Sequence, residues 1–213
     1  MQEIINFIDY KQLIEYIRKP RKISKIVNRL FGKPSDRSIS KIKKWLLAYE
    51  RDDFINIVEE NDDMGILRKK LENEKADTVA IYGHGVRNPD SNSVEGAQSI
   101  EGIKGMIHMR NILDNIVTDN LVIISCVGGT PNNINPEVSS GTWSSVFERF
   151  NGIIISCKWS VPTEDTIELI SQMYNHTLDE GMNISEALLT AQRYMKNRGK
   201  GELSWAGVEC WIN

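Results

Sequence analysis

Two short, strongly apolar runs, each ending at a chemically reactive side chain beside glycine, constrain the fold of this chain most tightly. The first, residues 77–85, reads DTVAIYGHG, and the second, residues 120–129, reads NLVIISCVGG. Short apolar runs bounded by turn residues are typical of strands buried on both faces of a parallel sheet. In an open α/β sheet the chemistry lies at the carboxyl ends of the strands. The sequence therefore predicts that His84 and Cys126 meet in one crevice.

Strand-like and helix-like segments alternate through most of the chain. From residue 54 onward, the apolar spacing predicts strands over 54–58, 78–82, 121–125, 152–159 and 205–212. It predicts helices over 64–74, 106–116, 143–150, 163–180 and 185–196. Alternation of this kind with short connections predicts an α/β fold, a mostly parallel sheet with helices on both faces. Polar, glycine-containing loops over 86–105 and 128–141 are expected at one end of that sheet.

The first 50 residues differ in charge from the rest. The chain carries a net charge of -3, yet residues 18–44 contain 11 Lys or Arg and one acid, Asp36. Helical apolar spacing, with Ser38 or Asp36 available as a cap, predicts three short helices over 2–17, 23–31 and 38–49. We therefore expect two units, a basic helical N-terminal module over 1–50 and an α/β domain over 51–213.

Two interpretations of the basic module stay open. Its helices either pack on the sheet with their Lys and Arg side chains solvated, or they bind an anionic partner, a nucleic acid or an acidic protein, through residues 18–44. The second interpretation is supported only by charge and by a loose helix-turn-helix spacing of the second and third helices.

Several classes of protein are disfavoured by the composition. No apolar run approaches the ~18 residues of a membrane span, and the first residues do not resemble a signal peptide, so a cytoplasmic protein without a membrane partner is expected. Three widely spaced cysteines give neither a disulfide framework nor zinc spacing. No phosphate-binding or dinucleotide fingerprint is present. The sequence thus predicts no metal and no cofactor.

His84 and Cys126 are residue types that perform acyl transfer together. A cysteine attacks carbonyls as the thiolate, and a neighbouring histidine can take its proton and later return it. The backbone amides of Gly85 and Cys126 are the expected donors to the developing oxyanion. Cys157 and Cys210 fall within predicted strands and are expected to pack as small apolar residues. The two other histidines, at 108 and 176, are expected at the surface of helices.

These motifs resemble those of a known family. The segments Tyr82-Gly83-His84-Gly85 and Ile123-Ile124-Ser125-Cys126, followed by Gly129, are similar to the His-Gly and Ser-Ala-Cys-x-x-Gly elements of CHAT domains. These are the bacterial caspase-like cysteine peptidases. Further blocks in the same order, Trp159-Ser160-Val161 and Trp205-Ala206-Gly207, extend the resemblance over residues 54–213. The chain departs from the family at Ser125, where alanine is common.

The resemblance implies a caspase-like fold with His84 as general base and Cys126 as nucleophile. It also implies that Trp159 lies beside the substrate and that the acids after it, Glu164 and Asp165, could match a basic P1 side chain. The loops over 86–105 and 128–141 would then form the substrate cleft.

The expected function is that of a cysteine endopeptidase for specific protein substrates, in bacterial antiviral defence or regulated proteolysis, switched on by a sensor or an operon partner. Two alternatives stay open. The chain could be a catalytically silent adaptor, marked by an unreactive Cys126, or a nucleic-acid-binding regulator that uses its basic N-terminal helices.

Overall fold

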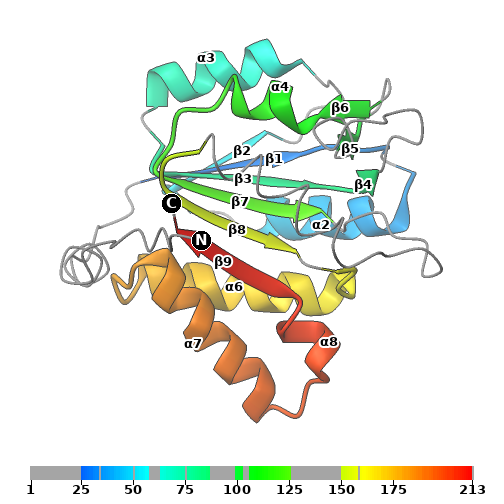
Figure 1. The fold of residues 1–213 in the computed structure, drawn as a ribbon, viewed down its shortest axis with the longest axis vertical. Helices are drawn as coiled ribbons and strands as arrows, with labels where there is room; N and C mark the ends of the chain where they lie inside the picture. Colours follow the sequence, from blue (N-terminus) through cyan, green and yellow to red (C-terminus); the bar gives the residue numbers. More distant parts are fainter. Residues whose placement is uncertain are drawn as a thin grey trace, which may run out of the picture.

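The computed structural model describes residues 25–33, 35–49, 51–57, 63–74, 76–86, 99–102, 106–125, 150–157 and 159–212. Strands and helices alternate along these residues, as Figure 1 shows. In chain order they are β1 (Ile26–Leu30), α2 (Arg37–Ala48), β2 (Phe54–Ile57), α3 (Met64–Glu74), β3 (Thr78–Gly83), β4 (Gly85–Val86), β5 (Ser99–Glu101), β6 (Met106–His108), α4 (Met109–Leu113), β7 (Asn120–Ser125), β8 (Ile153–Cys157), α6 (Thr163–Leu178), α7 (Ile184–Asn197), α8 (Glu202–Trp205) and β9 (Val208–Ile212).

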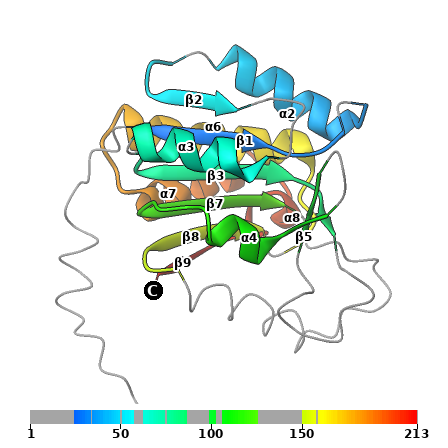
Figure 2. The ribbon, with the colours of Figure 1, turned by 90° about the horizontal axis from the view of Figure 1, so that it is seen from above.

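One six-stranded sheet organises the described residues. Its strand order is β2-β1-β3-β7-β8-β9, which can be followed across the sheet in Figure 2. The first five strands of that order are parallel, and β9 runs antiparallel to β8. The predicted α/β class is therefore confirmed. Strands β7 and β8 are buried along their whole length, which explains their largely apolar sequences. Strand β1 is buried throughout as well, although it contains Asn28 and Arg29.

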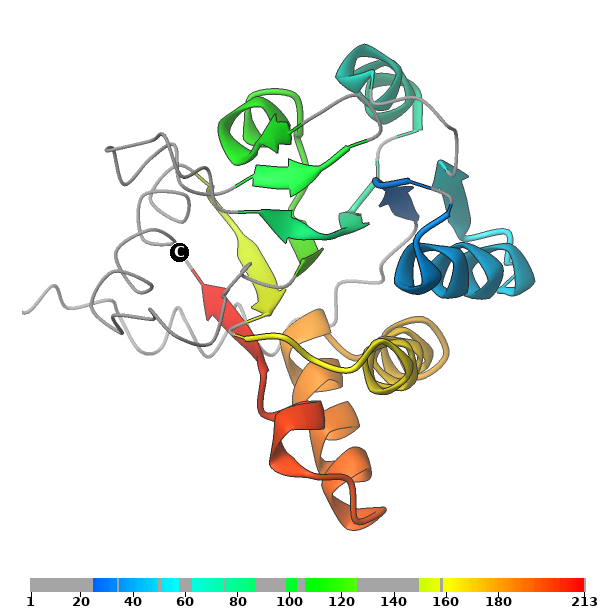
Figure 3. The same cartoon turned by 90° about the vertical axis from the view of Figure 1, so that its right-hand side faces the viewer.

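Helices cover both faces of the sheet, and each face has its own apolar core. Alternate residues of a strand point to opposite faces, so in β1 Ile26 packs in the core beneath α2, α6 and α7, while Val27 packs in the core beneath α3 and α4. Figure 3 shows these two helical layers on either side of the sheet. Among the described helices, none combines the length and the apolar character required to cross a bilayer.

The helix predicted over 23–31 is wrong. Residues 26–30 form β1, which is hydrogen-bonded to β2 on one side and to β3 on the other. Its apolar spacing fits a helix, but β-branched residues buried on both faces suit an interior parallel strand equally well, and spacing alone does not separate the two. The predicted helix over 2–17 lies outside the described residues.

The expected boundary at residue 50 does not separate two units among the described residues. Strand β1 lies within the sheet, and α2, the predicted third helix, packs on it through Ile39, Ile42 and Leu46. The α2 residue Lys41 forms an ion pair with Glu164 of α6. Both observations agree with the interpretation in which this segment packs on the sheet. Binding of an anionic partner stays a prediction.

Smaller differences from the sequence predictions occur near the carboxyl edge of the sheet. Part of the segment expected to be a loop over 86–105 forms an antiparallel sheet of β4, β5 and β6, beyond the carboxyl end of β3 in Figure 1. The helix expected over 106–116 begins as β6 and is helical only over Met109–Leu113. The predicted loop over 128–141 lies outside the described residues, as does nearly all of the helix predicted over 143–150.

Candidate functional site

The two strands that lead to His84 and Cys126 are neighbours in the sheet and end at the same level. Strands β3 and β7 are parallel, and Gly83 is paired with Ser125, the last residue of β7. The residues that follow this pair in the sequence are His84 and Cys126. Cys126 itself lies outside the described residues, so its role as nucleophile stays a prediction. Adjacent strands ending at the same level are nevertheless what the predicted pair requires.

His84 also lies at the point where the strand order of the sheet changes direction. From β1 the chain goes to β2 on one side of it and then to β3 on the other. In open α/β sheets, ligands bind outside the carboxyl ends of the strands at such a switch point, because the connections leave in opposite directions and open a crevice there. The residues after β1 and His84, after β3, lie on either side of this switch point.

Asp36, in the connection after β1, approaches His84 across this crevice. Its Oδ1 atom lies 3.1 Å from Nε2 of His84, and the two side chains are 41% and 37% exposed. The two atoms are at hydrogen-bond distance but lack the alignment of a full hydrogen bond. Nε2 of His84 is shielded from solvent and makes no aligned hydrogen bond within the described residues. The pKa of the Asp36 carboxyl is lowered, first by this contact with His84 and then by backbone amides.

The position of Asp36 is fixed by the beginning of α2. Its Oδ1 accepts hydrogen bonds from the backbone amides of Ser38 (2.8 Å) and Ile39 (3.2 Å), which makes it the N-cap of that helix. The turn before it contains Gly32 with φ of +122°, a conformation suited to glycine. The sequence analysis identified Asp36 only as a helix cap and missed its proximity to His84, although it is the single acid among the basic residues 18–44.

The backbone around His84 is held by the small sheet. The amide of Glu101 donates to the carbonyl oxygen of His84 at 2.8 Å, and Gly85 is paired with Ile100. Position 83 accepts no side chain without rearrangement, because an added Cβ would lie 2.5 Å from Cγ2 of the buried Ile100. The Tyr-Gly-His segment is therefore packed closely against β5.

The N–H of Gly85 is directed away from β5. In an antiparallel pair, opposed residues alternate between those that exchange hydrogen bonds and those that do not. Since the bond between Glu101 and His84 flanks the Gly85–Ile100 pair, that pair is of the second kind. The ladder thus leaves the Gly85 amide uncommitted, which agrees with its predicted role as an oxyanion donor.

A buried polar network supports the strands beneath the site. The hydroxyls of Tyr82 and Tyr174 on α6 lie 2.8 Å apart, so one of them donates to the other. Oδ1 of Asn28 on β1 lies 3.2 and 3.3 Å from them and accepts from the hydroxyl whose proton remains. Asn28 in turn donates to Asn56 of β2 at 2.9 Å. Burial raises the pKa of both tyrosines, which therefore stay neutral. The network joins β1, β2, β3 and α6 directly below the crevice.

The predicted substrate-binding residues lie beyond β8, two strands away from His84 in the sheet order. Trp159 is half-buried, and its indole N–H donates to the carbonyl of Leu203 at 3.3 Å. Glu164 and Asp165 lie in the first turn of α6. Each already has a cationic partner, Lys41 for Glu164 and Lys200 for Asp165. Recognition of a basic P1 side chain by either acid would have to displace that partner, and it stays a prediction.

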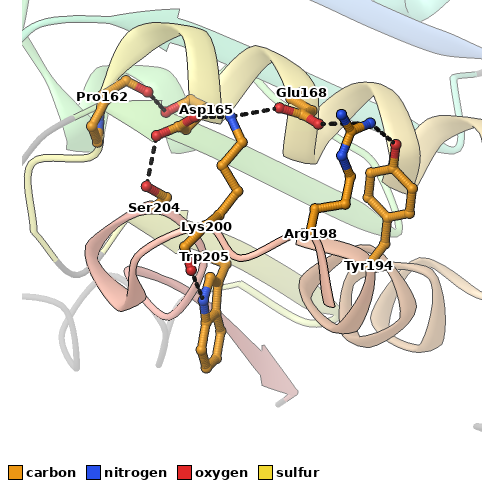
Figure 4. Close-up of polar contacts among 9 residues, drawn as sticks. Pro162, Asp165, Glu168, Tyr194, Arg198, Lys200, Ser204 and Trp205 are labelled. Atoms are coloured by element: carbon orange, nitrogen blue, oxygen red, sulfur yellow. Dashed lines mark hydrogen bonds and ion pairs between the residues drawn. The ribbon is translucent and has the colours of Figure 1, made fainter. Parts of the chain in front are cut away.

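Asp165 joins α6 to the segment around α8. Its carboxylate accepts from Lys200 at 2.7 Å and from the Ser204 hydroxyl at 2.6 Å, and Lys200 also contacts Glu168 at 2.9 Å, as Figure 4 shows. The pKa of Asp165 is lowered, first by Lys200 and then by Ser204, while that of Lys200 is raised by the two acids. The geometry indicates a structural clamp.

We expect Asp165→Asn to lower the free energy of unfolding by about 1 to 2 kcal/mol at pH 7, where the ionised carboxylate binds Lys200 and Ser204. A carboxyl with a lowered folded pKa stabilises the fold above its unfolded pKa of 3.8 and loses that contribution as the pH falls below it. The urea midpoints of wild type and variant, measured from pH 7 to pH 3, are therefore expected to converge in acid.

The matched control is Glu72→Gln, which breaks the exposed pair of Glu72 with Arg68. Both of those side chains are about 60% exposed, so the variant is expected to change the free energy of unfolding by less than about 0.5 kcal/mol. A difference between Asp165→Asn and wild type that persists unchanged at pH 3 would contradict an ionic clamp.

The other cysteines and histidines have structural surroundings. Cys157 is buried, and burial raises the pKa of Cys210 to about 11. His108 contacts Ser99 at 3.1 Å, and His176 pairs with Glu180 at 2.7 Å. Within the described ranges, no three acids, histidines or cysteines are grouped so as to hold a metal ion.

Comparison with models of known protein families and with curated proteins gives no match. The resemblance to CHAT domains thus remains a hypothesis that depends on the quoted motifs and on the geometry of the site.

Proposed function

We propose that the protein is a caspase-like cysteine endopeptidase in which His84 activates the thiol of Cys126. The observation that carries this proposal is the pairing of Gly83 with Ser125, because it means that β3 and β7 end side by side. His84 and Cys126 are the next residues in the sequence. The switch-point crevice beside His84 is where an α/β sheet holds a ligand. The resemblance of the two motifs to CHAT domains supports the same assignment.

The mechanism uses two chemical steps. The Cys126 sulfur forms a bond to the scissile carbonyl carbon while His84 takes the thiol proton, and that proton then goes to the leaving amine as the C–N bond breaks. His84 next removes a proton from a water molecule whose oxygen bonds to the thioester carbon. The C–S bond then breaks, His84 returns the proton to the sulfur, and the carboxylic product leaves. The amides of Gly85 and Cys126 stabilise the oxyanion in both steps.

The substrate class is a protein cut at few sites, in a cytoplasmic defence or regulatory system in which a partner triggers cleavage. Neither a metal nor another cofactor takes part in this mechanism. The adaptor and the nucleic-acid-binding regulator remain alternatives, and thiol reactivity separates the adaptor from the peptidase.

The test is iodoacetamide alkylation of the three cysteines between pH 5 and pH 10, read by mass spectrometry. A thiol paired with an imidazole ionises well below the ordinary cysteine pKa of about 8.5, so we expect the half-maximal alkylation of Cys126 below pH 7. Cys157 and Cys210 serve as references within the same molecule: the first is buried, and the pKa of the second is about 11. If Cys126 follows the profile of an ordinary thiol, the proposed activation is refuted and the adaptor is favoured.

A further inference from the structure

A second side chain at the switch point extends the proposed dyad. We propose that Asp36 is a positioning residue that holds the imidazole of His84 in its working orientation and tautomer. This inference rests on the proposed function of His84. It starts from the 3.1 Å approach of Asp36 Oδ1 to His84 Nε2, two residues that are 48 positions apart in the sequence.

Asp36 is itself held in place. Two backbone amides of α2 bind its Oδ1, and its own amide donates to the carbonyl of Lys33 at 2.9 Å. A carboxylate anchored in this way cannot follow the imidazole freely, so the imidazole adjusts to the carboxylate. An orienting group performs its task only when its own position is fixed.

The two nitrogens of the His84 ring have different surroundings. Nε2 faces Asp36, is shielded from solvent and makes no aligned hydrogen bond with another described residue. Oδ1 of Asp36, 3.1 Å away, is the acceptor that a proton on Nε2 reaches once the ring turns into line, and Nδ1 is then the nitrogen that can accept the thiol proton. Hydrogen bonds of this kind are often poorly aligned before substrate binds and become shorter and straighter in the complex.

Two described charges near His84 neutralise each other. Lys33, in the turn after β1, and Glu101 of β5 lie on the elements that contact His84, and they pair with each other at 3.7 Å. Asp36 is thus the described acid that faces the ring. A negative charge at this position stabilises the imidazolium that forms when the thiol is deprotonated.

Asp36→Asn separates positioning from helix capping. Asparagine caps a helix as well as aspartate does, so α2 and the Oδ1 acceptor that faces His84 are retained, while the negative charge is lost. We expect the alkylation midpoint of Cys126 to rise by about one pH unit and cleavage to fall by about tenfold or more at neutral pH. The urea midpoint is expected to fall less than in Asp36→Ala, since the cap is kept and only the charge of a carboxylate with a lowered pKa is lost. Asp36→Ala is expected to change both reactivity and stability.

The matched control is Asn183→Ala, which removes the N-cap of α7. Asn183 accepts a hydrogen bond from the amide of Glu186 at 2.9 Å. It begins α7, which packs in one of the two cores, whereas β5 contributes to the core on the opposite face of the six-stranded sheet. This variant is expected to lower the urea midpoint and to leave the alkylation profile of Cys126 unchanged. If it changes the profile as Asp36→Asn does, the effect at Asp36 is general destabilisation and the proposal is overturned.

Nitrogen NMR of the His84 ring gives a readout that does not depend on Cys126. In a Cys126→Ala background, which cannot form the thiolate–imidazolium pair, the neutral ring is expected to carry its proton on Nε2, and the additional change Asp36→Ala is expected to shift the population toward the Nδ1–H tautomer. An unchanged tautomer together with an unchanged alkylation profile would overturn the role of Asp36 alone. A wild type whose Cys126 reacts as an ordinary thiol would instead refute the proposed function, and the role of Asp36 with it.

Discussion

Replacement of His84 by alanine is expected to raise the pH of half-maximal Cys126 alkylation from below 7 to about 8.5, the value of an unassisted thiol. The reason is the loss of the imidazolium that stabilises the thiolate. The same variant is expected to lower peptide cleavage by about 10² to 10⁴-fold, since it removes general acid–base catalysis. Alkylation is measured by mass spectrometry over the full pH range, because a low-pKa thiolate is also a weaker nucleophile and a single pH would understate the change.

His176→Ala is the matched control for this prediction. His176 lies on α6, where it pairs with Glu180 at 2.7 Å rather than with His84 or Asp36. The control is expected to preserve the wild-type profile of Cys126. If His84→Ala also preserves that profile, His84 does not activate the thiol and the proposed dyad is incorrect.

Ile26→Ala is expected to lower the free energy of unfolding by about 2 to 5 kcal/mol. Ile26 is fully buried in β1, beneath α2 and α6, and truncation leaves a cavity in the larger of the two cores. Urea denaturation followed by circular dichroism measures the change as a shift of the midpoint at constant slope. A loss of this size is a large part of the total stability of an ordinary domain.

The control for Ile26→Ala is Leu47→Ala on α2, where the side chain is 53% exposed. That variant is expected to change the free energy of unfolding by no more than about 0.5 kcal/mol. If residues 1–50 were a separate basic module, Ile26→Ala would leave the unfolding of the remaining domain unchanged. A second transition, or an unaltered main transition in this variant, would therefore contradict the position of β1 inside the sheet.

Much of the scaffold could be predicted because local pattern and tertiary environment agree there. The runs before His84 and Cys126 are continuous apolar segments, and they form β3 and β7, buried on both faces. Helix α3 begins and ends at the predicted residues, and α6 and α7 do so within two residues, since each carries an apolar stripe at helical spacing. The adjacency of the two strand ends also follows from the α/β pattern.

Strand β1 could not be predicted in the same way. Its five residues, Ile-Val-Asn-Arg-Leu, lie among basic residues and satisfy helical and strand spacing alike. The hydrogen-bond partners of β1, which are β2 and β3, decide between these states, and both follow it in the sequence. Length and spacing of a short apolar run carry no information about such distant partners.

The sequence by itself determined the α/β class, the helices that cover the sheet and the histidine and cysteine that follow neighbouring strands. Only the tertiary structure decided that β1 lies between β2 and β3, and hence that the strand order changes direction beside His84. It also decided that Asp36, a helix cap in the sequence, faces that histidine. The physical reason is that periodicity records which face of an element is buried, whereas contacts across a crevice depend on the order in which strands assemble.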